Sequence, residues 1–163
     1  QYGCGNRFTP EEAAKYSVKW DKIRFEPEEF AQRAKAISHF ELLGDNECSV
    51  DLDAGVSCRA GHTAFWMTWD GRMLPCGMMP EPVTYPLEQG FAEAWEELRK
   101  KTREIRTPVE CQKCAKKDVC NVCAAVCIAE TGKFNGVPEY VCRKTENKIR
   151  LMVEIGKEDR NED

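Results

Sequence analysis

Five cysteines fall within the seventeen residues 111–127, CQKCAKKDVCNVCAAVC, and this density constrains the chain more than any other feature. The whole chain of 163 residues contains ten cysteines. Disulfide scaffolds are usually short chains without a sizeable core, whereas a chain of this length can bury one. Adjacent CxxC pairs also make poor structural disulfides. We therefore expect the cysteines to bind metal rather than to form a disulfide framework.

Charge and hydropathy exclude two classes of partner. Lys and Arg number 24 against 28 Asp and Glu, a formal net charge of −4, so no broad basic face for nucleic acid is expected. No apolar run approaches the roughly eighteen residues of a membrane span, and no signal-peptide pattern is present. Reduced, metal-binding thiols indicate the cytoplasm. The first residues, QYGCGN, lack an initiator Met, and we expect a fragment of a longer protein.

Two helices are predicted before the first cysteine motif. The segment Thr9-Pro10-Glu11-Glu12 has an N-cap residue, a proline in the first turn and a glutamate at the capping-box position. A second helix is expected from about Pro27 to Gly44, and the acidic residues that follow, up to Ser57, are expected to form a loop. The residues expected to face the core are Ala13, Tyr16, Trp20 and Ile23 in the first helix and Phe30, Ala34 and Ile37 in the second.

The rest of the chain predicts a hairpin and further helices. Asp70-Gly71 lies between two β-rich runs in residues 64–76, which predicts a two-residue hairpin turn. Helices are expected at about 87–106, with Phe91, Trp95, Leu98 and Ile105 as its apolar stripe, and at about 144–156. The predicted fold class is α+β: a small β-hairpin and cysteine-rich loops wrapped around two metal clusters, with flanking α-helices.

The first group of candidate ligands comes from one loop and one distant residue. Cys111 and Cys114 form a CxxC, Cys120 follows after five residues, and Cys142 lies further along the chain. Four thiolates make a closed, four-coordinate site, which both zinc and a [4Fe–4S] cluster accept. The spacing CxxCxxxxxC is nearer to iron–sulfur proteins than to zinc fingers, which prefer two separated CxxC pairs.

The second group begins with Cys58 and Cys76, which the hairpin should bring toward one another. Two thiolates do not close a site, so further ligands are needed, and Cys123 and Cys127 are available. They are four residues apart and would share one face of a helix ending near Gly132. The five thiols of residues 111–127 are then explained, because three serve one cluster and two serve the other.

The methionines and tryptophans around the hairpin have simpler interpretations. Met67, Met73, Met78 and Met79 surround Cys76, and core packing is expected in preference to metal ligation. Of Trp66 and Trp69, one is expected to be buried and the other exposed.

The cysteine spacing resembles that of the SPASM domain, the C-terminal auxiliary-cluster module of radical S-adenosylmethionine (SAM) enzymes that modify peptides and proteins. The matching pattern is Cys58-x12-Gly71-x4-Cys76, then Cys111-x2-Cys114-x5-Cys120, and finally Cys142, over residues 58–142. The family pattern continues after the third cysteine of its loop with x3-C. Here Ala124 occupies that position, and Cys123 and Cys127 flank it.

The resemblance implies two [4Fe–4S] clusters, with zinc as the alternative occupant. One would be held by Cys111, Cys114, Cys120 and Cys142. The other would be held by Cys58 and Cys76 with Cys123 and Cys127, unless Cys48 supplies the fourth ligand or the site is open.

The implied domains are a helical bridge at 1–57, the SPASM domain at 58–142, and a C-terminal helix and charged tail at 143–163. The implied function is electron transfer and the binding of a peptide or protein substrate. The implied partner is a radical SAM barrel domain. The barrel's CxxxCxxC motif does not occur in this sequence, so SAM would bind in a separate domain and this chain alone would not be catalytic. The competing interpretation is a zinc-binding structural or interaction module.

Overall fold

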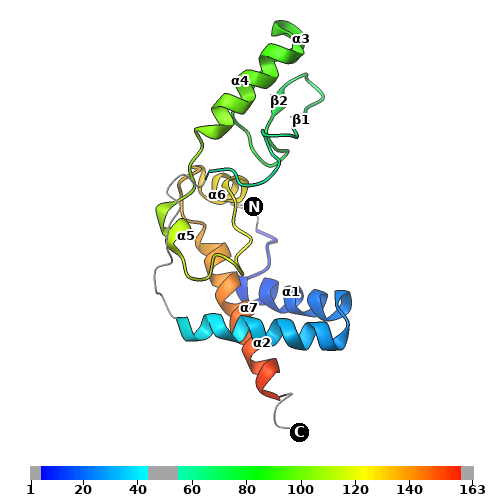
Figure 1. Cartoon of the computed structure of the whole chain (residues 1–163), viewed down its shortest axis with the longest axis vertical. Helices are drawn as coiled ribbons and strands as arrows, with labels where there is room; N and C mark the ends of the chain where they lie inside the picture. Colours follow the sequence, from blue (N-terminus) through cyan, green and yellow to red (C-terminus); the bar gives the residue numbers. More distant parts are fainter. Residues whose placement is uncertain (1–4, 44–54, 159–163) are drawn as a thin grey trace.

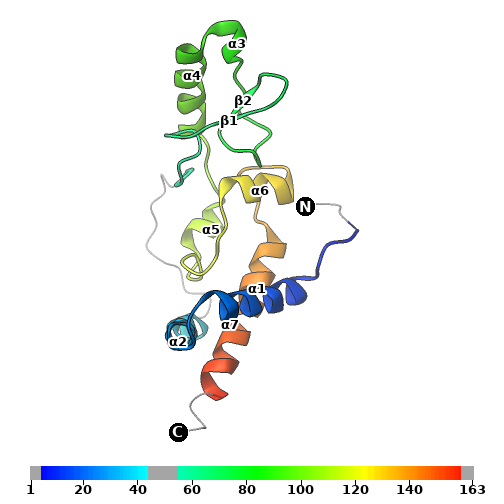
Figure 2. The same ribbon diagram turned by 90° about the vertical axis from the view of Figure 1, so that its right-hand side faces the viewer.

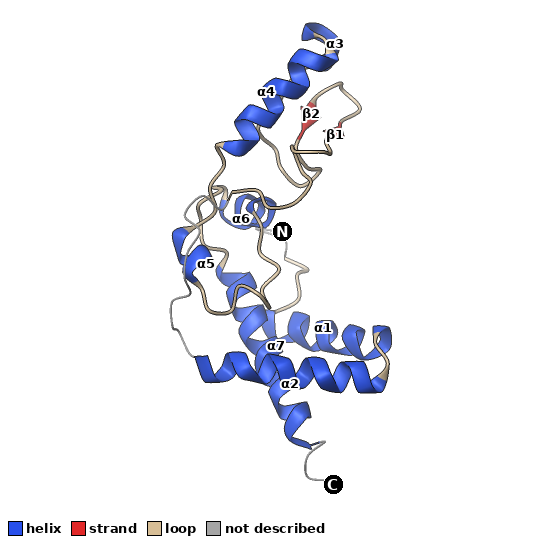
Figure 3. Cartoon of the chain, in the orientation of Figure 1, coloured by secondary structure: helices blue, strands red, loops and turns tan. Residues whose placement is uncertain are grey.

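The computed structural model describes residues 5–43 and 55–158. Helices dominate, and one small antiparallel sheet is present, as expected for a mixed α and β chain (Figure 3). The molecule is elongated, with the hairpin and α3–α4 at one end and a three-helix group at the other (Figure 1). The cysteine-rich segment, with α5 and α6, lies between these two ends (Figures 1 and 2).

The three-helix group consists of α1 (Pro10–Arg24), α2 (Pro27–Leu43) and α7 (Glu139–Glu158). The predicted capping box starts α1: the Thr9 hydroxyl accepts from the Glu12 amide at 3.2 Å, and the Glu12 carboxylate accepts from the Thr9 amide at 2.8 Å. Helix α7 packs across both α1 and α2, and its Lys148 pairs with Asp21 of α1 at 2.7 Å. Two helices from the first part of the chain and one from the last part thus form one packed unit.

The core of this unit confirms one predicted helix face and contradicts the other. Phe30 and Ala34 of α2 are buried as expected, and they join Val18 of α1 and Met152 of α7. The expected α1 face of Tyr16, Trp20 and Ile23 is wrong: these three side chains are 55%, 63% and 69% exposed. The buried face of α1 is instead formed by Ala14 and Val18, which are one helical turn apart.

A short hairpin forms in the predicted segment, but the predicted two-residue turn is wrong: the Thr68 amide donates to the Arg72 carbonyl at 2.9 Å, so three residues, 69–71, form the loop. Strands β1 (Trp66–Met67) and β2 (Met73–Leu74) pair antiparallel, with Trp66 opposite Leu74 and Met67 opposite Met73. Met73 and Met79 are buried, which supports core packing for those two, whereas Met67 and Met78 are exposed. The expectation of one buried tryptophan is wrong, because Trp66 is 55% and Trp69 97% exposed.

The helix predicted at 87–106 is divided into α3 (Pro86–Gln89) and α4 (Phe91–Arg103) by Gly90. Gly90 has φ 88° and ψ 146°, a conformation that other residues rarely adopt, so the helix cannot continue through it. Leu98 and Ile105 are buried as expected, but Phe91 is 54% exposed. The last two helices of the central region are α5 (Val109–Lys113) and α6 (Ala124–Thr131).

Helix α7 begins five residues before the predicted start, directly after Pro138. Cys142 therefore lies in its first turn, where its amide donates to the Pro138 carbonyl at 3.2 Å. The domain boundary expected between residues 142 and 143 falls inside this helix. Gly44 and the acidic loop from residue 45 to 54 lie outside the described residues.

Candidate metal centre

Four of the candidate ligands line one cavity of about 150 Å3. These are Cys111, Cys114, Cys120 and Cys142, the set that the spacing assigned to a single cluster. The cavity lies between the α5–α6 loop and the first turns of α7, with Pro138 and Val141 as apolar walls and Lys116 and Glu146 at its edge. Lys116 and Glu146 form an ion pair at 3.1 Å, which connects the loop to α7.

Backbone hydrogen bonds shape the segment from Cys111 to Cys120, which carries three of these thiols. Helix α5 ends at Lys113, and the carbonyl of the next residue, Cys114, accepts from the Lys117 amide at 3.1 Å. The Lys116 carbonyl then accepts from the amides of Val119 and Cys120, at 3.1 and 2.9 Å. Two successive turns therefore reverse the chain between Cys114 and Cys120, so that both line the same cavity.

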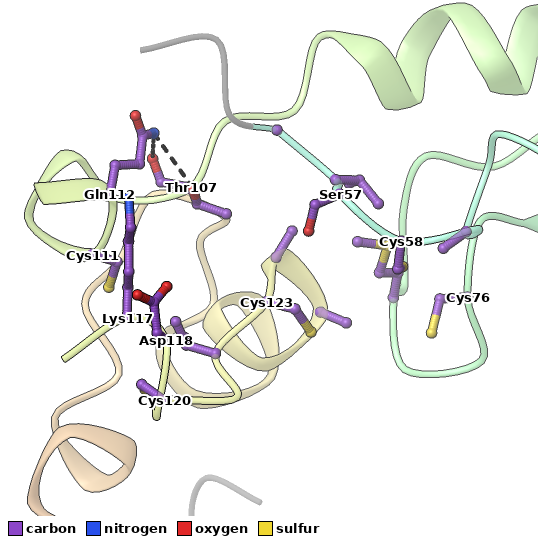
Figure 4. A pocket seen from close by; sticks show the side chains of 17 residues that line it. Ser57, Cys58, Cys76, Thr107, Cys111, Gln112, Lys117, Asp118, Cys120 and Cys123 are labelled. Carbon is purple, nitrogen blue, oxygen red and sulfur yellow. Dashed lines mark hydrogen bonds between the residues drawn. The ribbon is translucent and has the colours of Figure 1, made fainter. Parts of the chain in front are cut away.

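A second cavity, of about 320 Å3, is lined by Cys58, Cys76 and Cys123. Figure 4 shows Cys123 extending from the start of α6 toward the segments that carry Cys58 and Cys76. Cys111 and Cys120 line the opposite end of this cavity, so these two residues border both cavities. Polar side chains also contribute to the wall: Ser57, Thr107, Gln112, Lys117 and Asp118.

A small apolar cluster brings Cys76 and Cys123 to the same place. Met79, which follows the hairpin, packs with Ile105 and with Ala124 and Ala125 of α6, and Cys76 lies against this cluster. Because Ala124 directly follows Cys123, burying the alanines fixes the start of α6 next to the hairpin. The Met78 amide donates to the Cys76 sulfur at 3.5 Å, a hydrogen bond that favours a negatively charged sulfur.

The Cys58 segment is held by a tight turn against α4. The Arg59 carbonyl accepts from the amides of His62, Thr63 and Ala64 at 3.0–3.1 Å. Gly61 has φ +66° and its Cα lies against the buried side chain of Thr102 in α4. A side chain at this position would overlap Thr102, so the turn requires glycine. His62 contacts the Val56 carbonyl through Nε2 at 2.8 Å and holds the chain just before Cys58.

Cys127 differs in position from the other candidate ligands. It lies on α6 with 0% exposure and lines neither cavity. Interaction with the Cys111 thiol of α5 lowers the pKa of Cys127, and the same interaction, together with burial, raises the pKa of Cys111. The sequence grouped Cys127 with Cys58, Cys76 and Cys123, and in the structure its thiol has neighbours in both groups: Cys123, and also Cys111, Cys120 and Cys142.

The pKa of Cys142 is raised to about 11, first by burial and then by the negative charge of the neighbouring Cys111, Cys120 and Cys114 as their thiols ionise. Both the loss of hydration and the repulsion between like charges disfavour several thiolates in one small cavity without a cation. A metal centre supplies that positive charge and keeps its thiol ligands deprotonated.

The spacing of the thiols bears on which metal centre fits. Across residues 5–43 and 55–158, no group of three or more Cys, His, Asp or Glu side chains lies close enough to hold one metal ion. Tetrahedral zinc with Zn–S bonds of about 2.3 Å would bring its sulfurs to within about 4 Å of one another. In a cubane each thiolate binds a different iron atom, so the ligands surround a larger body. A set of four thiolates is a donor set that either centre accepts.

The polar wall residues Lys117 and Asp118 were not among the sequence candidates. They lie inside the CxxCxxxxxC loop, so their nearness to the thiols could have been inferred from the motif. Cys48 and Cys4 lie outside the described residues.

No helix in the described part of the chain is both long enough and apolar enough to cross a membrane. Comparison with protein-family models, curated proteins and solved structures finds no match to this chain.

Proposed function

We propose that this chain is an auxiliary iron–sulfur domain of the SPASM type, carrying two [4Fe–4S] clusters that serve electron transfer and the binding of a peptide substrate. The observation that carries the proposal is the cavity lined by Cys111, Cys114, Cys120 and Cys142. Helix α5 supplies Cys111, the loop after it supplies Cys114 and Cys120, and the first turn of α7 supplies Cys142. Cys58, Cys76 and Cys123 would hold the second cluster.

Each cluster, when bound, would accept or pass on an electron. The chain's own groups favour the reduced, more negative form in several places. The Met78 amide donates to the Cys76 sulfur, Lys116 borders the first cavity, and Lys117 borders both. The start of α6, which directly follows Cys123, adds the partial positive charge of a helix N-terminus.

The two cavities share the wall formed by Cys111 and Cys120. Two clusters bound there would be close neighbours, a suitable arrangement for passing one electron between them. The mouth of the larger cavity is the place where a peptide could approach the second cluster. Radical chemistry itself would require a domain with the CxxxCxxC motif, which these 163 residues lack.

The decisive measurement is the metal content of anaerobically reconstituted chain. Two cubanes require about eight iron and about eight acid-labile sulfide per chain. We expect both numbers, together with a brown colour and EPR signals from two reduced clusters. Stoichiometric zinc without labile sulfide would contradict the proposal and favour a zinc module.

Matched variants assign the ligands. Cys114→Ala should abolish the EPR signal of one cluster and spare the other, and Cys58→Ala should do the reverse. If both substitutions remove the same signal, the division into two clusters is wrong.

A further inference from the structure

The hairpin end of the molecule exposes a group of large apolar side chains. Phe65, which precedes β1, packs edge-on against Phe91 of α4 with ring centroids 5.5 Å apart, and Leu87 of α3 lies against Gly71 of the hairpin loop. These contacts hold the hairpin beside α3 and α4, but they leave the outer surfaces of the side chains in solvent. The exposed members, which we call the hairpin patch, are Phe65, Trp69, Leu87 and Phe91.

Helix α1 exposes a second apolar group at the other end of the molecule. Tyr16, Trp20 and Ile23 follow at helical spacing on the side of α1 that α2 and α7 leave uncovered. The ring of Phe8 lies 4.8 Å from that of Tyr16 and extends this stripe. We call Phe8, Tyr16, Trp20 and Ile23 the α1 patch.

The hairpin end is acidic. Residues 63–97 contain six acidic side chains and one basic side chain, Arg72, which forms an ion pair with Asp70 at 2.9 Å. Three carboxylates of this end have no ion-pair partner among the described residues, namely Glu81, Glu88 and Glu93. Glu88 directly follows Leu87, so uncompensated negative charge borders the hairpin patch.

Helix α1 has the opposite charge. It carries four basic and three acidic side chains, and one of the acidic ones, Asp21, is already paired with Lys148 of α7. Three exposed lysines, Lys15, Lys19 and Lys22, line one cavity along the side of the helix. Lys19 directly precedes Trp20, so positive charge borders the α1 patch.

The two patches therefore match in apolar character and differ in the sign of their charge. A lysine ammonium group is attracted to the face of an exposed indole ring and to a carboxylate, and the hairpin end offers both. Pairing either patch with its own copy would instead bring like charges together. The exposed parts of the eight side chains amount to roughly 1,100 Å2, near the lower limit for specific interfaces. This area suits a reversible contact.

We propose that the hairpin patch of one copy of this chain docks on the α1 patch of a second copy. The patches lie toward opposite ends of an elongated molecule (Figures 1 and 2), so each contact leaves one patch free at either end of the complex. Such a head-to-tail contact does not close on itself, and the oligomers lengthen as the concentration rises. The inference does not rest on the proposed iron–sulfur function.

The first experiment is sedimentation equilibrium of the reduced full chain over micromolar to millimolar concentrations, with reductant present to prevent disulfides between copies. The average mass of the wild type should rise with concentration, and added salt should oppose this rise. Trp69→Ala and Trp20→Ala should each weaken the association at least about tenfold. The matched control is Val109→Ala, since Val109 is also exposed but lies in α5, outside both patches, and it should associate like the wild type.

Mixing the two tryptophan variants distinguishes the proposed contact from other forms of self-association. Each variant keeps the patch that the other has lost, so an equimolar mixture should form a one-to-one complex and nothing larger. Both tryptophans are exposed, and the urea midpoint of each variant should equal that of the wild type, which shows that the fold is intact.

Three results would overturn the inference. The first is a wild-type chain that stays monomeric at every concentration. The second is a loss of association in only one of the two tryptophan variants, because a patch that pairs with its own copy needs only one of them. The third is a mixture of the variants that forms no complex.

Discussion

Replacing Gly61 by alanine should loosen the segment that carries Cys58 from helix α4. Gly61 has φ +66°, and a Cβ built there would lie 2.6 Å from Cγ2 and 2.8 Å from Cβ of Thr102, with Oγ1 closer still. Thr102 is fully buried and its hydroxyl donates to the Leu98 carbonyl at 2.7 Å. The threonine therefore cannot turn away without losing this hydrogen bond.

The expected loss of stability has two parts. An L-residue with a left-handed backbone costs about 1–2 kcal/mol. Overlap with a packed side chain costs about 1–3 kcal/mol more. Reduced freedom of the unfolded chain returns about 0.4–1 kcal/mol. We expect the free energy of unfolding to fall by about 3 kcal/mol in Gly61→Ala.

Gly132→Ala is the matched control, because Gly132 also has positive φ, at +75°, but a Cβ there would meet nothing within 4 Å. It should lose only about 1 kcal/mol, so the difference between the two variants measures the overlap with Thr102. Urea denaturation of identically prepared proteins, followed by far-UV circular dichroism, gives both values. Hydrogen exchange then locates the effect of Gly61→Ala in α4.

Equal losses in the two variants would refute this reasoning, because the overlap would then contribute nothing. A further check uses Thr102→Ala, which removes the two closest atoms. In the Gly61→Ala background this substitution should cost less than it does in the wild type. Additive losses would show that the two residues do not interact.

Three further predictions concern packing, an ion pair and metal removal. Met152→Ala should lower the free energy of unfolding by about 2–5 kcal/mol, because Met152 is 1% exposed at the centre of the three-helix core; a loss below about 1 kcal/mol in urea denaturation would contradict this. Arg7 makes two hydrogen bonds to Glu130 of α6, at 2.7 and 2.8 Å, so Arg7→Gln should lower the free energy of unfolding by about 1–3 kcal/mol in the same assay. The double variant Arg7→Gln/Glu130→Gln should be only slightly less stable than Arg7→Gln, because the interaction is already lost. Removing metal should speed hydrogen exchange across residues 111–142, where α5 and α6 are short, and spare α7 beyond residue 145; unchanged exchange at 111–142 would show that order there does not depend on ligation.

The parts of the fold that the sequence determined are local. The capping box at Thr9 and Glu12 forms as the motif predicts, because both partners lie within one helical turn. The location of the hairpin around Asp70 and Gly71 was also predicted, although its loop has three residues instead of two. The Gly132 cap depends on neighbouring residues alone, and Gly132 ends α6 with φ 75°. The grouping of Cys111, Cys114 and Cys120 around one cavity follows from the same kind of short-range spacing.

The packing partners of each helix were decided only by the tertiary structure. Helix α1 carries apolar side chains on two faces, and its sequence does not show which one a neighbour will cover. Helix α7 covers Ala14 and Val18, the smaller residues, which allow the helices to approach closely, and Tyr16, Trp20 and Ile23 remain exposed. A periodic pattern marks the faces that can be buried, but long-range contacts select among them.

The same limit applies to the cysteines. Spacing on a helix correctly indicates that Cys123 and Cys127 are one turn apart, but it does not say which structure lies opposite each of them. That depends on Met79 and Ile105 packing against Ala124 and Ala125, which orients α6 between the hairpin and α5. In this orientation Cys123 faces the larger cavity with Cys58 and Cys76, and Cys127 is buried in the interior. The sequence therefore determines how many thiols the chain carries, whereas contacts between residues far apart in the chain determine which cavity each thiol lines.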